Sequence, residues 1–291
     1  MNRGIIYALS AYIFWGLHPI YWKMLSNVPS EQIVSQRIFW SFIFFVIIIS
    51  YRKGWKGFFS KMKTVEKKYK ILLPALLIGS NWSLYIWAVN AGYIIETSLG
   101  YFISPLLNIF LGTFFLKEKL RPLQWVAVAI AFIGVIATTI LYGQFPWISI
   151  YLATSWLLYS LMRKKSPLNS AEGLMLETAM LSIPALVYIS FLSFNGTNSF
   201  FSNLSVTSML IGSGIISGLP LMIFIAGSRL INLSLIGIMQ YIYPTMIFLI
   251  GAYVYNEPLN EAKMIGFIFI WIALIVYSLE GSIYLAKKKF A

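Results

Sequence analysis

Long apolar runs recur along this chain, separated by short polar breaks. A window of about 19 residues finds about ten such runs, and each is long enough as a helix, at about 1.5 Å per residue, to cross about 30 Å of hydrocarbon. The runs are continuously apolar, and a helix satisfies its own backbone hydrogen bonds in lipid, so the pattern predicts membrane-spanning helices and no sheet. The expected spans are residues 4–25, 33–51, 71–90, 97–116, 123–142, 147–163, 173–193, 208–227, 233–254 and 262–285.

Composition supports a membrane protein and excludes several kinds of chemistry. Hydrophobic residues make up 59% of the chain, charged residues make up 11%, and the mean hydropathy is +0.79. That balance cannot give both an apolar core and a water-facing surface. The chain has no cysteine, which removes disulfides, thiol nucleophiles and thiolate metal sites. The first run carries Trp15 and Trp22 and has no small-residue cleavage site, so we expect a span there and not a signal peptide.

Two segments far apart in the chain share one pattern. A single constant offset aligns SPLLNIFLGTFFLKEKL with YPTMIFLIGAYVYNEPL and superimposes Pro105 on Pro244 and Glu118 on Glu257. Duplication inside a membrane protein is typical of transporters, in which two similar halves move about a shared central site. The repeat therefore favours solute movement as the function.

The basic residues gather on one side of the expected spans. If the N-terminus is cytoplasmic, most of the 22 Lys and Arg residues fall on that side, and the positive-inside rule then places both termini in the cytoplasm. We expect the basic stretch 52–70 to rest against anionic headgroups. The net charge of +13 is therefore explained by the membrane, and no nucleic-acid partner is expected.

Orientation and repeat together predict the architecture. An odd number of spans in each half requires the second half to start on the opposite side of the membrane, so the repeats are inverted. We predict an all-α integral membrane fold of about ten transmembrane helices, with one inverted five-helix repeat over residues 1–143 and the other over 144–291, forming one structural unit. Pro105 and Pro244 would then be symmetry-related kinks beside the central site, although proline can also simply bend a membrane helix.

Several motifs resemble a known family. They are AYIFWGLHPIYWK, QRIFWSF, NWSLYIWAVNAGYIIETSLGYFISPLLN, RKKSPLNSAEGLMLET and QYIYPTMIFLIGAYVYNEPLN, which together extend over nearly the whole chain. This pattern is similar to the RarD branch of the EamA-type drug/metabolite transporter superfamily. The resemblance implies a ten-helix secondary transporter of the inner or plasma membrane, in a superfamily whose members export amino acids, drugs and metabolites.

Helical spacing selects the residues that could line a central cavity, because positions three or four apart share a face. Aromatic stripes of this kind more often pack helices or form an interfacial belt, and both interpretations stay open. The candidate solute-binding residues are Trp15, His18, Lys23, Arg37, Asn81, Tyr85, Tyr101, Pro105, Asn108, Trp156, Ser217, Gln240, Tyr241, Tyr243 and Pro244.

Two cations lie inside apolar runs, where desolvation disfavours them. Arg37 could hold a carboxylate or phosphate of a solute through two parallel hydrogen bonds, with Lys23 as a second positive charge. Alternatively, both cations pair with Glu96 or Glu31 and form an outer gate. The sequence favours neither interpretation.

Glu177 is a carboxylate within the seventh expected span. It could carry a coupling proton, because desolvation favours the neutral acid. It could equally pair with Arg163, Lys164 or Lys165 near the end of the sixth span. His18 is the only histidine, and a lone imidazole without Cys or carboxylate neighbours does not predict a metal site.

These patterns favour a secondary carrier that moves a small organic solute, anionic or zwitterionic, by alternating access. Coupling to protons or to a counter-solute is left open, and no cofactor is expected. All nine acidic residues are Glu, so a Ser-His-Asp triad is impossible, and no glycine-rich phosphate loop indicates direct use of ATP. A gated channel built from the same helices and an integral-membrane transferase are the alternatives.

Overall fold

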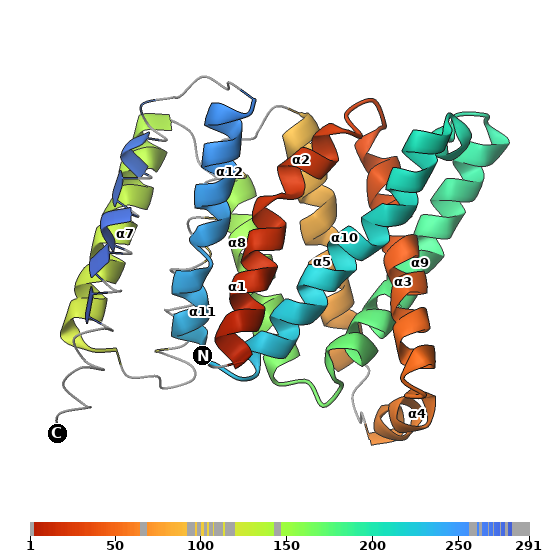
Figure 1. Ribbon diagram of the computed structural model, residues 1–291, viewed down its shortest axis with the longest axis horizontal. Coiled ribbons are helices and arrows are strands. Elements are labelled where there is room, and N and C mark those ends of the chain that lie inside the picture. The colour runs from red at the N-terminus through yellow and green to blue at the C-terminus, as the bar shows by residue number, and fades with distance from the viewer. Residues whose placement is uncertain are drawn as a thin grey trace. The chain divides into compact units, whose positions relative to one another are not determined.

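Every element of the described chain is helical, as the sequence predicts. The computed structural model describes residues 3–64, 69–91, 120–142 and 147–255, with shorter pieces between 97 and 113 and between 261 and 280. Figure 1 shows the described elements as helices. They are α1 (Arg3–Gly16), α2 (His18–Lys23), α3 (Ser30–Tyr51), α4 (Trp55–Thr64), α5 (Tyr69–Asn90), α7 (Pro122–Tyr142), α8 (Trp147–Lys164), α9 (Ser170–Phe194), α10 (Leu204–Ser228), α11 (Leu233–Met239) and α12 (Ile242–Tyr253), with the 3-10 helix η1 (Ser199–Phe201) before α10.

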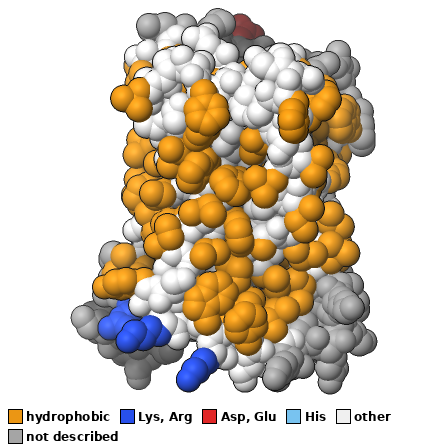
Figure 2. Space-filling view, turned by 90° about the vertical axis from the view of Figure 1, so that its right-hand side faces the viewer, with side chains coloured by type: hydrophobic (Ala, Val, Ile, Leu, Met, Phe, Trp, Pro, Cys, Tyr) orange, Lys and Arg blue, Asp and Glu red, His pale blue; other side chains and the backbone are white. Residues whose placement is uncertain are grey.

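Within these residues, five helices are long and apolar enough to cross a bilayer. They coincide with five of the expected runs and lie at 30–51, 71–88, 122–141, 170–194 and 204–228. Their outward faces are apolar: on α9, Ile183, Val187 and Phe191 form an exposed stripe at helical spacing. Figure 2 shows a broad apolar surface on this side of the molecule. A surface of this extent is stable in hydrocarbon and not in water, so the chain is a multi-pass membrane protein.

The chain forms two compact units. The first contains residues 1–92 and 155–230, and the second contains residues 93–154 and 231–291. The boundary falls within α8, and each unit takes segments from both halves of the chain. The predicted repeats, 1–143 and 144–291, divide the chain by sequence, and their inverted relation stays a prediction.

In the first unit, α3 is the central helix and packs against α9 and α10, while α1 packs along α10. The α3–α10 contact is close because Gly214 has no side chain. A Cβ atom at Gly214 would lie 2.3 Å from the backbone carbonyl carbon of Trp40. The Ser41 hydroxyl donates a hydrogen bond of 3.1 Å to the Gly214 carbonyl at this contact. Small residues allow membrane helices to approach in this way.

Two of the expected continuous spans are interrupted. Residues 4–25 form α1 and α2, with a break at Leu17, and residues 233–254 form α11 and α12, with a break at Gln240 and Tyr241. A proline follows each break, Pro19 in α2 and Pro244 in α12. Proline lacks an N–H and crowds the carbonyl four residues earlier, but it fits the first turn of a new helix. Pro105, the predicted partner of Pro244, lies outside the described residues.

The second unit includes α7, α11 and α12. Its core is formed by Ala127, Ala131 and Val135 of α7 with Tyr241 and Ala273. The small side chains of α7 allow close packing, since a Cβ atom at Gly134 would lie 2.5 Å from Cβ of Phe269. At the start of α7, Arg121 donates a hydrogen bond of 2.5 Å to Glu280. This ion pair joins two segments that are distant in sequence.

We expect Gly214→Ala to destabilise the protein by about 1–3 kcal/mol, because α3 and α10 must move apart to admit the methyl group. The measurement is the Tm of the purified full-length protein in detergent. The matched control is Gly57→Ala in α4, where an added Cβ would meet nothing within 4 Å. This control should keep or slightly raise the Tm, since alanine favours a helix over glycine. Equal Tm values for Gly214→Ala and the wild type would contradict the close contact.

Candidate functional site

Arg37 of α3 is buried at membrane depth in the first unit. Its exposed fraction is 4%. Its guanidinium carbon lies 4.3 Å from the ring centroid of Trp82 on α5 and 5.0 Å from that of Trp22 on α2. A desolvated guanidinium gains about 2 kcal/mol or more from an aromatic face. The two indoles therefore hold the cation where water cannot solvate it.

His18 connects this cation to α10. Its ring stands edge-on to Trp22, with centroids 5.7 Å apart. The other contact of the imidazole is to the Ile216 carbonyl, 3.1 Å from Nε2. A carbonyl can only accept, so Nε2 carries the hydrogen in this arrangement. The break before α2 places His18 and Trp22 one turn apart on the same face.

Aromatic rings from α1, α8 and α10 meet beside these residues. The ring centroids of Trp15, Trp156 and Phe224 are 5.3 Å apart in all three pairings. Tyr12 adds an edge contact to Phe224 at 5.8 Å. Tyr12 and Phe224 are fully buried and serve packing, whereas Trp15 and Trp156 are only partly buried. The two tryptophans are therefore the members of this cluster that could also contact a solute.

Four buried polar atoms of the same region have no hydrogen-bond partner among the described residues. They are Nε1 of Trp22, Nε1 of Trp156, Oγ of Ser160 and Oγ of Ser217. Serine in a helix commonly bonds the carbonyl one turn earlier, and these two serines do not. Buried polar groups are nearly always satisfied, so unsatisfied ones indicate a place for a ligand or water. The indole N–H of Trp22 in the Arg37 cluster, the indole N–H of Trp156 in the aromatic cluster and two hydroxyls of the same unit are thus available.

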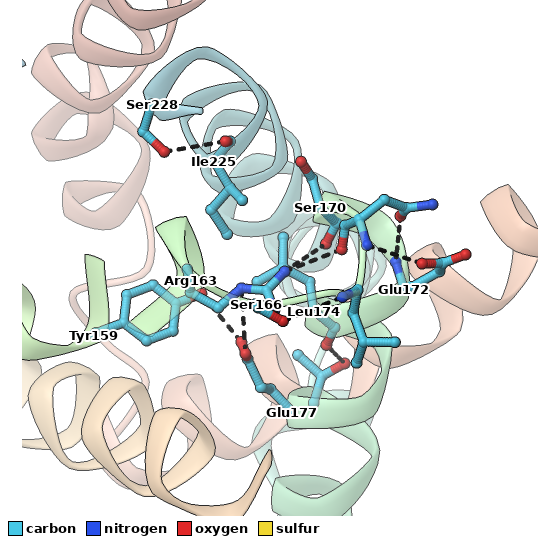
Figure 3. Close-up of polar contacts among 12 residues, drawn as sticks. Tyr159, Arg163, Ser166, Ser170, Glu172, Leu174, Glu177, Ile225 and Ser228 are labelled. Atoms are coloured by element: carbon cyan, nitrogen blue, oxygen red, sulfur yellow. Dashed lines mark hydrogen bonds and ion pairs between the residues drawn. The ribbon is translucent and has the colours of Figure 1, made fainter. Parts of the chain in front are cut away.

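A second buried arginine lies at the end of α8. Figure 3 shows Arg163 surrounded by Tyr159, Glu177 and the chain between α8 and α9. Its Nε lies 3.4 Å from Oε1 of Glu177, and both side chains are 3% exposed. Tyr159 donates to Oε2 of Glu177 at 3.0 Å. Of the two interpretations of Glu177, the structure shows the ion pair with Arg163.

Gly173 makes room for this arginine. A Cβ atom at Gly173 would lie 2.0 Å from Nη1 of Arg163. The guanidinium therefore lies against the backbone of α9, where Nη2 donates 3.0 Å to the Asn169 carbonyl. The motif RKKSPLNSAEGLMLET thus contains the arginine, the glycine that admits it and the carboxylate that neutralises it.

The start of α9 is held by further polar contacts at the same end of the unit. Asn169 and Glu172 form a reciprocal capping box with hydrogen bonds of 2.8 and 2.9 Å. Lys61 of α4 lies 2.8 Å from Oε1 of Glu172. Arg229, just after α10, donates to the carbonyls of Ser166 at 3.0 Å and Arg163 at 3.2 Å. Burial, followed by the nearby Arg163 guanidinium, lowers the pKa of Arg229 from its ordinary value.

Sequence reasoning missed the roles of Tyr159, Glu172 and Lys61 in this cluster. Asn169 followed by Glu172 just before an apolar run is a capping-box signal that could have located the start of α9. The contact between Lys61 and Glu172 crosses from α4 to α9, and the spacing of the sequence carries no signal for it.

The other candidates have varied surroundings. Asn81 of α5 donates 2.9 Å to Ser155 of α8, Tyr85 is partly buried, and Lys23 is exposed at the end of α2. In the second unit, the rings of Tyr101 and Tyr243 meet edge-on at 4.7 Å, and Gln240, Tyr241 and Pro244 are buried. Pro105, Asn108 and Glu96 lie outside the described residues. The first unit thus places Trp15 against Trp156, and it places His18 and Arg37 against Trp22.

Comparison with known proteins is consistent with this architecture. Residues 2–140 match the EamA-like transporter family. The chain is 42% identical to the uncharacterized transporter YojE of Bacillus subtilis, over 95% of this chain and 94% of the relative. It is 38% identical to protein RarD of Escherichia coli, over 96% and 95% respectively. A crystal structure with 19% sequence identity covers 96% of this chain and 98% of that chain with a TM-score of 0.69, and therefore shares the fold.

The apolar helices and the relatives together define a multi-pass membrane protein of the transporter class. The chain belongs to the EamA-like transporter family, in the RarD branch of the drug/metabolite transporter superfamily. The predicted resemblance to this branch is thereby confirmed.

We expect Glu177→Gln to destabilise the protein by about 3–5 kcal/mol, because it leaves the buried Arg163 charge without its counter-ion. The measurement is the Tm of the purified protein. In the matched control, Glu31→Gln removes the same charge from an exposed position at the start of α3 and should change the Tm little. The double variant Arg163→Met, Glu177→Leu should recover much of the loss. A double variant that is less stable than the sum of the single changes would contradict a mutual pair.

Proposed function

We propose that this protein is a secondary transporter of the cytoplasmic membrane that moves a small organic solute by alternating access. One observation carries the proposal: Arg37 is buried against two indoles, and one of them, Trp22, has a buried N–H without a partner among the described residues. An intramembrane cation of this kind is costly and usually marks a solute or ion site. The transporter family of the chain favours a solute site over a purely structural role.

The chemistry of the site favours a solute with an anionic group, including a zwitterion. A guanidinium binds a carboxylate or phosphate through parallel hydrogen bonds. The indole N–H groups of Trp22 and Trp156 add neutral donors, and the hydroxyls of Ser160 and Ser217 can donate or accept. Trp15 and Trp156 offer partly buried aromatic faces for an apolar part of the solute.

The proposed architecture has ten membrane helices in two inverted five-helix repeats, with both termini in the cytoplasm. The breaks before α2 and before α12 support it, because transporters commonly build solute sites at interrupted helices. A gated channel would use similar helices but would show large single-channel currents, whereas a carrier saturates and shows counterflow. An integral-membrane transferase would turn over a lipid or metabolite in the purified state.

Coupling to a proton gradient and exchange with a counter-solute are the two candidate driving forces. Glu177 pairs with Arg163 and accepts a hydrogen bond from Tyr159, so it has a role in positioning these two side chains. Counter-solute exchange requires no titrating group. Uptake in proteoliposomes with and without an imposed pH gradient separates the two.

The first test of the function is a thermal-shift screen followed by counterflow. Purified protein is heated with amino acids, nucleosides and drug-like carboxylates, and a bound solute raises the Tm by mass action. The solute that raises the Tm is then assayed for counterflow in proteoliposomes. We expect Arg37→Gln to abolish the shift and to lower counterflow at least about tenfold, because the charge that binds the anionic group is removed.

Two variants make this test specific. Arg37→Lys keeps the charge without the planar fork and should retain part of the activity. Arg3→Gln removes one cation from an exposed position at the start of α1 and should transport like the wild type. Full counterflow by Arg37→Gln protein would end the assignment of Arg37 to the solute site.

The proposed topology predicts a labelling pattern. The natural chain has no cysteine, so single cysteines can be introduced directly. We expect Gln144→Cys and Asn256→Cys to react with a membrane-impermeant maleimide added outside intact cells. Lys165→Cys should react only after permeabilisation, because the basic connections face the cytoplasm. Labelling of Gln144→Cys from the cytoplasm alone would contradict the inverted arrangement.

A further inference from the structure

We propose that the corner between α3 and α4 binds the headgroup of an anionic phospholipid. The surface, called the basic corner here, consists of Tyr51, Arg52, Lys53, Lys56 and Phe59. It lies in the first unit, at the end where α8 joins α9. The proposal does not depend on which solute the protein carries.

The corner has the shape of a membrane-surface element. Figure 1 shows α4 lying across the end of α3. Trp55 fixes this turn by donating 3.0 Å to the Ser50 hydroxyl, and Phe58 is buried. Phe59 stacks on Trp55 with ring centroids 5.9 Å apart but remains 58% exposed. A short helix with one aromatic face and basic neighbours is typical of a segment in the headgroup region.

The charge of the corner is not neutralised by the protein. Arg52, Lys53 and Lys56 are exposed and form no ion pair with another described residue. Lys61, farther along α4, is engaged by Glu172 and is not part of the surface. Figure 2 shows Lys and Arg side chains at one end of the apolar surface. Three cations directly beside a lipid-facing belt complement an anionic headgroup.

Lys53 occupies a backbone conformation that usually selects glycine. It follows the end of α3 with φ 49°, the one non-glycine residue with a positive φ in the part of the chain that the structure describes. The Lys53 N–H donates to Ser50 at 3.0 Å and the Gly54 N–H donates to Ile49 at 2.9 Å. This is the Schellman pattern, in which the left-handed position is mostly glycine. A lysine in this position costs backbone strain, and we infer that its positive charge has a function that offsets this cost.

Exposed aromatic groups favour a lipid over the other anionic partners. Tyr51 is 89% exposed next to Arg52, and Phe59 remains 58% exposed although one face lies against Trp55. Tyrosine and other aromatic rings are enriched at the membrane–water boundary, where an acyl chain and a phosphate lie side by side. Nucleic acid or an acidic protein would satisfy the cations and leave these rings in water.

Binding at this corner would also hold the start of α9. Lys61 bonds both carboxylate oxygens of Glu172 at 2.8 and 2.9 Å, and Glu172 closes the capping box of α9. An anchored α4 therefore keeps Lys61 in place at the helix that carries Glu177.

The test measures lipid binding to the purified full-length protein by native mass spectrometry. Phosphatidylglycerol and phosphatidylcholine with identical acyl chains are titrated in detergent, and the ratio of their apparent affinities is recorded. We expect the wild type to prefer phosphatidylglycerol. Each removed cation should lower that preference about fivefold, so the triple variant Arg52→Gln, Lys53→Gly, Lys56→Gln should lose it.

Single variants separate binding from folding. Lys53→Gly relieves the left-handed position, so its Tm should equal or exceed that of the wild type while its lipid preference falls. Lys56→Arg keeps the charge and should keep the preference. Lys165→Gln removes an exposed cation from the α8–α9 connection at the same end and should change the preference less than about twofold.

Three results would overturn the proposal. They are a wild type without preference for phosphatidylglycerol, a Lys53→Gly variant with an unchanged preference, and an equal loss in Lys165→Gln. The last result would indicate a diffuse surface potential in place of a site. Inorganic phosphate that competes as well as the lipid would show a phosphate site without a role for the acyl chain.

Discussion

The cost of placing a full charge in an apolar environment governs this structure. Arg37 and Arg163 are both buried in the first unit, and each needs compensation that lipid cannot supply. Arg163 forms an ion pair with Glu177, whose carboxylate also accepts a hydrogen bond from Tyr159. Arg163 also donates a hydrogen bond to the Asn169 carbonyl. Arg37 lies against the faces of two indoles, and a guanidinium is also the side chain best suited to bind a carboxylate or phosphate. The surroundings of Arg163 are mainly structural, whereas those of Arg37 are the basis of the proposed solute site.

The geometry of the helices allows both buried arginines to be compensated. The missing side chain at Gly173 allows the Arg163 guanidinium to lie on α9, and the missing side chain at Gly214 allows α3 and α10 to touch. The break before α2 orients His18 and Trp22 toward α3 and α10. Arg229 and the capping box of α9 hold the connection between α8 and α9 in place through hydrogen bonds. Polar contacts are thus concentrated at helix ends and breaks, where backbone groups are unpaired.

Much of the fold followed from the apolar runs. Helices α3, α5, α7, α8, α9 and α10 lie within a few residues of expected spans, because length and hydropathy decide whether a segment crosses a bilayer. The break at Leu17 was not predicted, since a hydropathy window averages over a proline. A kink at Pro244 was expected, and the break at Gln240 and Tyr241 lies just before it. Arg37 and Glu177 were identifiable as unusual because charge is rare in such runs. Arg163 was among the three cations offered as partners of Glu177. Trp82 was not offered as a partner of Arg37, because it lies on another helix. Glu96, Pro105 and Asn108 fall outside the described residues and stay predictions.

By itself, the sequence determined the helices, the membrane class, the family and the positions where a polar group must be compensated. These properties depend on local composition and spacing, which one chain displays completely. Only the tertiary structure decided which residues provide the compensation. Helices α3, α9 and α10 are apolar on nearly every side, so no amphipathic pattern indicates which face turns inward. The rotation of each helix is instead set by close contacts such as that at Gly214, and this rotation brings Trp82 to Arg37 and Glu177 to Arg163.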